Sequence, residues 1–117
     1  MYCSVRNTLN LIGKKWSMLI ILELFKGGEK WKRYSKIKRS IAGITSRMLS
    51  RRLMELERDK LILKKISKKN NQKICYYSIS DSGRGLIPLI KEMKDWSLKF
   101  RIDNTHCRKT DCKECVI

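Results

Sequence analysis

Residues 41–60 read IAGITSRMLSRRLMELERDK, a short break followed by a regularly patterned segment. Ala42 and Gly43 favour a tight turn, because glycine adopts backbone conformations that other residues avoid. Thr45 suits the N-cap of a helix, since its side-chain oxygen can accept a hydrogen bond from an unpaired backbone N–H group. Ile44 before it is available as a hydrophobic staple. The segment therefore predicts a turn that leads directly into a capped helix.

The helix expected after Thr45 is amphipathic, because its apolar residues recur at the three- and four-residue intervals that share one helix face. The apolar face holds Met48, Leu49, Leu53 and Leu56, and the opposite face holds Ser46, Arg47, Ser50, Arg51 and Met54. Another short helix is indicated upstream by the three- and four-residue spacing of Tyr34, Ile37 and Ile41. Two short helices joined by a tight glycine-containing turn predict a helix-turn-helix, with the second helix at about residues 45–59.

The pattern changes after Lys60. Residues 61–67 and 73–79 have the composition of strands, and the polar residues between them suit a turn. This predicts a β-hairpin with a basic tip, or wing, at about residues 67–73. The turn is expected to consist of Lys68, Lys69, Asn70 and Asn71. A helix-turn-helix followed by a two-stranded wing is a winged helix, so we expect a mostly α fold with a small β-hairpin, of the α+β class.

Charge points to a polyanionic partner. The 117 residues include 28 Lys and Arg against 11 Asp and Glu, a net charge of +17. Fifteen of the basic side chains and three of the acidic ones fall in residues 31–74. A Lys-rich solvated surface would not concentrate in this way, so we expect nucleic acid, and first of all double-stranded DNA, as the partner. Residues 16–25 form the longest apolar segment, far short of the roughly 20 residues that span a bilayer, so we expect a cytoplasmic protein without membrane contact.

Helices are also expected at the two ends of the chain. An N-terminal helix is indicated by the spacing of Val5, Leu9 and Ile12, and residues 16–25 have the composition of a buried helix. A short strand is expected within residues 31–34.

The final helix is expected to begin after Ser80, with Pro88 as a kink or local start. Its apolar stripe exceeds what one small winged domain can cover, although part of it must pack within the subunit. With the N-terminal helix it can form a two-fold interface, so we expect a homodimer. The expected dimerisation residues are Val5, Leu9, Ile12, Met93, Trp96 and Phe100. Residues 1–103 are then one domain, which binds DNA and dimerises, and residues 104–117 are a Cys-rich tail.

An ordered set of short motifs resembles the HxlR-type transcriptional regulators, winged-helix relatives of the MarR proteins. The matching pieces are Cys3, Ile12-Gly13-Lys14-Lys15-Trp16, Trp31-Lys32-Arg33-Tyr34, Ile44-Thr45, Leu49-Ser50-Arg51-Arg52-Leu53, Leu56-Glu57, Tyr76-Tyr77-Ser78-Ile79-Ser80, Gly83, Leu86, Pro88 and Trp96. The resemblance implies a homodimeric DNA-binding repressor or activator whose dimer is built from the first and last helices. The chain departs from the family in Tyr34, where phenylalanine is usual, and in its tail.

A helix fits the major groove, where side chains of its N-terminal turns reach the base edges. The expected contacts from the helix are Thr45, Ser46, Arg47, Ser50 and Arg51, and Arg47 and Arg51 are the principal ones because arginine pairs bidentately with guanine. Contact to phosphate alone is the alternative for each arginine. Arg52 and Arg58 are expected at the surface or in ion pairs.

The wing supplies a second set of expected contacts. Lys68, Lys69 and Asn70 at its tip suit phosphate oxygens or the minor groove. Lys32 and Lys36 are also expected to contact DNA, where they fix the entry of the helix that precedes residues 45–59. Because a dimer carries two recognition helices about 34 Å apart, we expect an operator that is an inverted repeat.

The cysteines leave three interpretations open. Cys107, Cys112 and Cys115 have a spacing that can bind Zn²⁺ or another metal, with Cys3 as a fourth ligand if the termini meet at a dimer interface. The same thiols can form a regulatory disulfide. The resemblance adds weight to a redox role for Cys3, since some HxlR-type regulators sense oxidants or electrophiles through a cysteine near this position. The third interpretation is a tail with free thiols.

No enzyme is indicated, because His106 is the sole histidine and no catalytic set can be assembled around it. No cofactor is required by the pattern, with a metal at the C-terminal cysteines as the open possibility. The alternative to a DNA-binding regulator is a winged-helix module that binds RNA or protein. The basic helix and basic wing together favour DNA.

Overall fold

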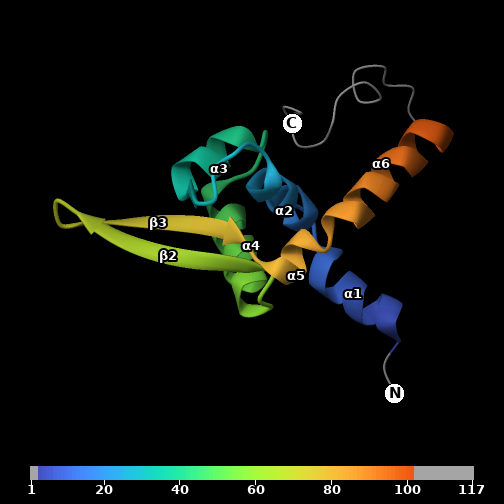
Figure 1. Cartoon of the computed structure of the whole chain (residues 1–117), viewed down its shortest axis with the longest axis horizontal. Helices are drawn as coiled ribbons and strands as arrows, with labels where there is room; N and C mark the ends of the chain where they lie inside the picture. Colours follow the sequence, from blue (N-terminus) through green and yellow to red (C-terminus); the bar gives the residue numbers. More distant parts are fainter. Residues whose placement is uncertain (1–2, 102–117) are drawn as a thin grey trace.

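The computed structural model describes residues 3–101, and within them six helices and three strands form a winged helix of the α+β class. The elements are α1 (Ser4–Ile12), α2 (Ser17–Phe25), β1 (Lys32–Arg33), α3 (Tyr34–Ser40), α4 (Ser46–Arg58), β2 (Ile62–Lys69), β3 (Gln72–Ile79), α5 (Asp81–Arg84) and α6 (Ile87–Phe100). The β2–β3 hairpin projects from one end of the molecule, and α1 and α6 lie at the opposite end (Figure 1). No helix in the described part of the chain is long and apolar enough to cross a membrane.

The helix-turn-helix consists of α3, α4 and the turn between them. Thr45 caps α4 as expected, because its Oγ1 accepts a hydrogen bond from the Met48 N–H group at 3.1 Å. Gly43 in the turn has a φ of +85°, a conformation that favours glycine. A side chain there would also meet the ring of Trp16, 3.6 Å from where a Cβ would stand. The turn therefore depends on the positive φ of Gly43, and it lies beside the Trp16 ring in the chain that leads into α2.

Two of the expected boundaries were wrong. Residue 16 is not helical: α2 begins at Ser17, and Trp16 is its N-cap with a φ of +82°. The hairpin turn is two residues rather than four, since Asn70 and Asn71 both have positive φ and β2 runs on to Lys69. Asparagine tolerates this conformation, which two-residue hairpin turns require.

The three strands form an antiparallel sheet in the order β1-β3-β2. Its longest ladder pairs Ile62 with Ile79 at the base and Lys69 with Gln72 at the tip. The base is closed by α5, where Gly83 packs directly on the Leu61 carbonyl: a Cβ at Gly83 would stand only 2.1 Å from that oxygen. The hairpin is therefore buried at its base and exposed toward its tip.

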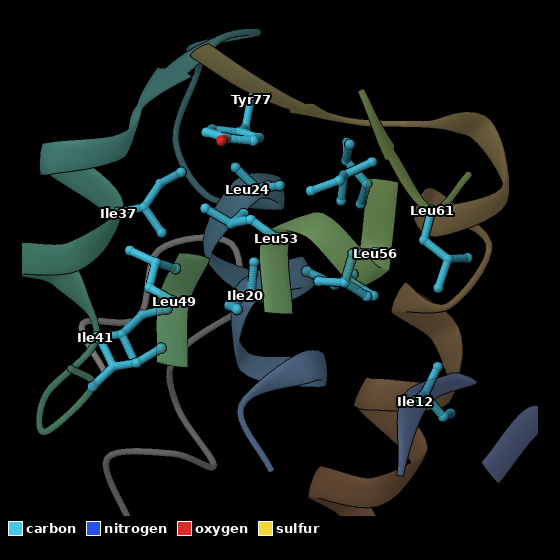
Figure 2. Packing of buried hydrophobic residues seen from close by; sticks show 14 of the residues in the cluster. Ile12, Ile20, Leu24, Ile37, Ile41, Leu49, Leu53, Leu56, Leu61 and Tyr77 are labelled. Carbon is cyan, nitrogen blue, oxygen red and sulfur yellow. The ribbon is translucent and has the colours of Figure 1, made fainter. Parts of the chain in front are cut away.

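One apolar core joins the sheet base to the helices. Figure 2 shows Tyr77 of β3 over Leu24 of α2 and Leu53 of α4, with Ile12 at the edge of the cluster. The core residues of α4 are the apolar face that its period predicts, namely Leu49, Leu53 and Leu56. This packing fixes the opposite face of α4 toward solvent.

The expected single C-terminal helix is two helices. Ser80 caps the short α5, its Oγ accepting from the Gly83 N–H group at 3.1 Å. Pro88 then stands in the first turn of α6, which is the local start that its missing N–H group allows.

Candidate nucleic-acid interface

The outward face of α4 is a stripe of three arginines and one methionine. Arg47, Arg51, Met54 and Arg58 are all exposed and follow one another at intervals of four, three and four residues. Arg58 meets the expectation of an ion pair, since its Nε lies 3.4 Å from Asp59 Oδ1, yet its side chain is 65% exposed. The helical period that places Arg47 and Arg51 on the outward face also places Arg58 there, so the exposed stripe is longer than the set of contacts expected from the sequence.

Arg52 and Glu55 are turned away from this stripe. Arg52 donates to the Lys15 carbonyl at 2.9 Å and to Glu55 Oε1 at 2.7 Å, and Lys14 donates to Glu55 Oε2 at 2.6 Å. The hydrogen bond from Lys14, followed by that from Arg52, holds the pKa of Glu55 below its ordinary value. The network ties the chain between α1 and α2 to α4, and it keeps this carboxylate off the arginine stripe.

Ser46 and Ser50 lie at the side of α4 that faces α3. The Tyr34 hydroxyl donates to the Ser46 carbonyl at 2.9 Å and lies 2.9 Å from Ser50 Oγ. Both serines are exposed, as is Thr45 at the N-cap. The five residues expected to contact DNA from this helix are therefore together at its N-terminal half.

The wing carries exposed lysines along both strands. Lys68 of β2 is paired directly with Lys73 of β3, next to the turn. Like charges placed opposite each other in a sheet repel, so this pair is unfavourable unless an anion lies near it. Nearer the base, Lys65 Nζ lies 4.7 Å from the ring centroid of Trp31 and 5.4 Å from that of Tyr76. Lys68, Lys69 and Asn70 are all exposed at the tip, as the sequence predicts.

A groove of about 480 Å³ separates α4 from the wing. It is lined by Tyr34, Ser50, Leu53, Met54, Glu57, Lys64, Lys73, Cys75 and Tyr77. Burial raises the pKa of Tyr77, whose ring lines the inner part of this groove, to about 12. Lys64 and Lys73 thus stand across the groove from the helix, and the cationic surface continues from α4 to the wing.

Lys32 does not belong to this surface, and its expected role in DNA contact was wrong. Its side chain is buried, donates to the Glu23 carbonyl, and lies 3.7 Å from the Glu23 carboxylate. Burial lowers the pKa of Lys32, opposed by the charge of Glu23. The two-residue strand β1 places Lys32 under the end of α2, an arrangement that depends on tertiary packing and leaves no periodic signal.

Lys36 lies in α3 with its side chain 42% exposed and forms an ion pair with Glu29. The hydrogen bond from Lys36 lowers the pKa of Glu29. Lys36 is therefore accessible, but its charge is already shared with a carboxylate.

The expected dimerisation residues divide into two groups. Val5, Leu9, Met93, Trp96 and Phe100 are exposed large apolar side chains, with exposures from 51% to 67%. Trp96 and Phe100 pack on each other with ring centroids 5.8 Å apart. Ile12 is instead 9% exposed and belongs to the core of the single subunit.

The cysteines are separated along the chain. Cys3 is exposed at the N-cap of α1, and Cys75 is half-buried in the groove. Cys107, Cys112 and Cys115 lie outside the described residues, as does the predicted tail. Within residues 3–101, no group of three or more His, Cys, Asp and Glu is placed to hold a metal ion.

The fold and the cationic surface together define the class of winged-helix transcriptional regulators. The family model described as HxlR-like helix-turn-helix matches residues 11–104, and the chain belongs to this family. The resemblance read from the sequence motifs is thereby confirmed.

Relatives of known sequence are described as transcriptional regulators. The chain is 47% identical over 91 residues to the HTH-type transcriptional regulator YdzF of Bacillus subtilis, covering 78% of this chain and 81% of that protein. It is 39% identical over 114 residues to the HTH-type transcriptional regulator YdeP of the same species, covering 95% and 86%.

Solved structures show the same architecture. The redox regulator HypR in its oxidized form matches with a TM-score of 0.72 and 33% identity, covering 86% of this chain and 99% of that one. The reduced form of the transcriptional regulator YodB from B. subtilis matches with a TM-score of 0.71 and 30% identity, covering 89% and 99%.

Proposed function

We propose that this regulator binds double-stranded DNA in a sequence-specific manner, as a homodimer on an inverted repeat. In each subunit α4 enters the major groove, and the tip of the wing contacts the phosphate backbone or the minor groove. The observation that carries the proposal is the exposed stripe of Arg47, Arg51 and Arg58, held outward by the burial of the opposite face of α4.

The dimensions of the two partners support this arrangement. An α-helix with its side chains is about 10–12 Å across, and the major groove is about 12 Å wide. The guanidinium groups of Arg47 and Arg51 have the fork geometry that matches the two acceptors of guanine. The repulsion between Lys68 and Lys73 is relieved when a phosphate lies between them.

The dimer is supported by the apolar side chains that α1 and α6 leave exposed. Both helices lie at the end of the molecule opposite the wing tip, so an interface there leaves both wings free (Figure 1). Ile12 is not part of this proposed interface, because it is buried within the subunit.

A filter-binding comparison tests the proposal against an RNA-binding or protein-binding module. The purified chain is titrated with duplex DNA, duplex RNA and single strands of matched length at several salt concentrations. The proposal requires tightest binding to duplex DNA, weakening steeply as salt rises. Tighter binding to RNA or to single strands would contradict it.

A second proposal is thiol-responsive regulation, favoured by the exposure of Cys3 at the start of α1 and by the likeness to HypR in its oxidized form. In this scheme two thiols lose two hydrogen atoms to an oxidant and form one disulfide. The partner of Cys3 is its copy in the second subunit or one of the tail cysteines, and Zn²⁺ at Cys107, Cys112 and Cys115 is the metal-based variant.

Thiol labelling of anaerobically purified protein, with and without reductant and chelator, tests this scheme. The expected result is that at least two of the four cysteines are protected, and that oxidation changes DNA affinity in the native chain but not in Cys3→Ser. Full labelling under every condition, with no metal by elemental analysis and no change of affinity, would contradict it.

A further inference from the structure

One hydroxyl group links the two helices of the helix-turn-helix. The Tyr34 oxygen, at the start of α3, lies 2.9 Å from the Ser46 carbonyl oxygen and 2.9 Å from Ser50 Oγ. A phenol has a single hydrogen to donate, and a carbonyl can only accept. The Tyr34 hydrogen therefore goes to Ser46. It follows that in the second contact Ser50 is the donor and Tyr34 the acceptor.

This assignment uses the only hydrogen that Ser50 can donate. Its oxygen keeps lone pairs for other partners, and the residue is exposed on α4. We propose that Tyr34 fixes Ser50 as a hydrogen-bond acceptor, and that Ser50 thereby selects an adenine or cytosine over a thymine or guanine at one position of each half-site. The inference rests on the proposed function, because it requires α4 to lie in the major groove.

The hydrogen-bonding groups in the DNA major groove determine which bases Ser50 selects. The hydrogen-bond donors on the base edges in the major groove are the N6 amino group of adenine and the N4 amino group of cytosine. Guanine and thymine offer acceptors there, and phosphate oxygens are acceptors as well. A serine whose hydrogen is committed cannot bond to any of these acceptors. A serine free to rotate would accept from or donate to either kind of base.

Every base pair carries one amino group in the major groove, so the selection concerns orientation rather than pair type. Ser50 distinguishes A·T from T·A and C·G from G·C, according to which strand presents the amino group to it. It does not distinguish adenine from cytosine. Because Ser50 borders the groove between α4 and the wing, the base it faces lies on the wing side of those faced by Arg47 and Arg51.

Tyr34→Phe is the direct test, since it removes the hydroxyl and keeps the ring. Site selection from a random duplex pool is carried out with the native chain, with Tyr34→Phe and with Ser50→Ala. The position at issue is the one whose base preference Ser50→Ala abolishes. Affinities are then measured on four duplexes that carry each base there. The native chain should favour adenine and cytosine by about two- to tenfold, the range of one neutral hydrogen bond.

In Tyr34→Phe this ratio should fall close to one, while the preferences at the positions read by Arg47 and Arg51 stay unchanged. A purely structural role of Tyr34 would weaken binding to all four duplexes equally and leave the ratio intact, which would overturn the inference. A native preference for guanine or thymine at this position would overturn it too. If the native chain shows base preferences elsewhere but none that depends on Ser50, the inference alone fails. If it shows no base preference at any position, the proposed function fails with it.

Discussion

Arg47 and Arg51 differ from Lys69 in what their side chains are placed to recognise. The arginines are on the exposed face of α4, in its N-terminal half, whereas Lys69 ends β2 at the tip of the wing. A planar guanidinium matches two base acceptors, and an ammonium group acts as a point charge near phosphate.

Arg47→Ala and Arg51→Ala should therefore each cost about 1–3 kcal/mol of binding free energy on the operator and relax the base preference. Lys69→Ala should weaken binding to all duplexes alike and reduce the slope of log affinity against log salt by about one unit. Fluorescence titration on operator and random duplexes at several salt concentrations measures both. If the arginine variants lost the same binding free energy on both duplexes, Arg47 and Arg51 would contact phosphates and not bases.

Lys32 should behave unlike any lysine of the wing, because its ammonium group is buried against Glu23. Lys32→Met should lower the free energy of unfolding by about 1–3 kcal/mol through loss of charged hydrogen bonding at the end of α2. The salt slope of DNA binding by the folded protein should not change. Urea unfolding and salt titration measure the two effects, with Lys69→Met as the matched control. A smaller slope of log DNA affinity against log salt in Lys32→Met would show that Lys32 contacts DNA after all.

At the level of elements, α4 is held on its inner side by the network of Glu55 with Lys14 and Arg52. Because the folded pKa of Glu55 is lowered, the carboxylate stabilises the fold above the ordinary value of 4.5, and that contribution disappears as pH falls through the lowered pKa. Because Lys14 lies partly in solvent, which screens its charge, Glu55→Gln should lower the unfolding free energy at neutral pH by about 0.5–1 kcal/mol.

In acid the unfolding free energies of the native chain and Glu55→Gln should converge. Thermal or urea unfolding between neutral and acid pH checks this, with Glu57→Gln on the exposed side of α4 as control. A difference between native chain and Glu55→Gln that stays constant down to strong acid would show that the network does not depend on ionised Glu55.

The elements differ in how far the sequence predicts them. The helix-turn-helix and the hairpin follow from local signals: a capped helix with a three- and four-residue period, and two strand segments around asparagines. The shorter hairpin turn and the start of α2 at Ser17 depend on single residues with positive φ, namely Asn70 and Asn71 in the turn and Trp16 before α2. The burial of Lys32 depends on which helix end covers a two-residue strand, and local sequence contains no signal for that.

The candidate site shows the same division. Exposure of Thr45, Ser46, Arg47, Ser50 and Arg51 follows from the helical period, because the buried face of α4 determines which residues face outward. The hydrogen bond between Tyr34 and Ser50 joins residues sixteen positions apart. It could not be predicted from the sequence, because it depends on how α3 packs on α4.

At the scale of the whole molecule, α1 and α6 leave apolar side chains in water that a single subunit does not cover. Trp96 and Phe100 are more than half exposed, so Trp96→Glu and Phe100→Glu together should leave the subunit folded and give a monomer. Deletion of residues 1–12 is a poorer test, because it also removes Ile12 from the core.

Sedimentation at micromolar concentration measures this result. Ile66→Glu is the matched control, since Ile66 is an exposed apolar residue of the wing and should leave the dimer intact. A native chain that sediments as a monomer, or a double variant that remains a dimer, would contradict the proposed interface.

The most direct test of the proposed function is selection of binding sites from a random duplex DNA pool with the purified native chain. We predict enrichment of an inverted repeat whose half-site centres lie about 34 Å apart, one turn of the duplex, with guanine at the positions read by Arg47 and Arg51. A pool that remains random after repeated rounds, while the folded protein still binds duplex DNA, would show that the cationic surface does not read sequence.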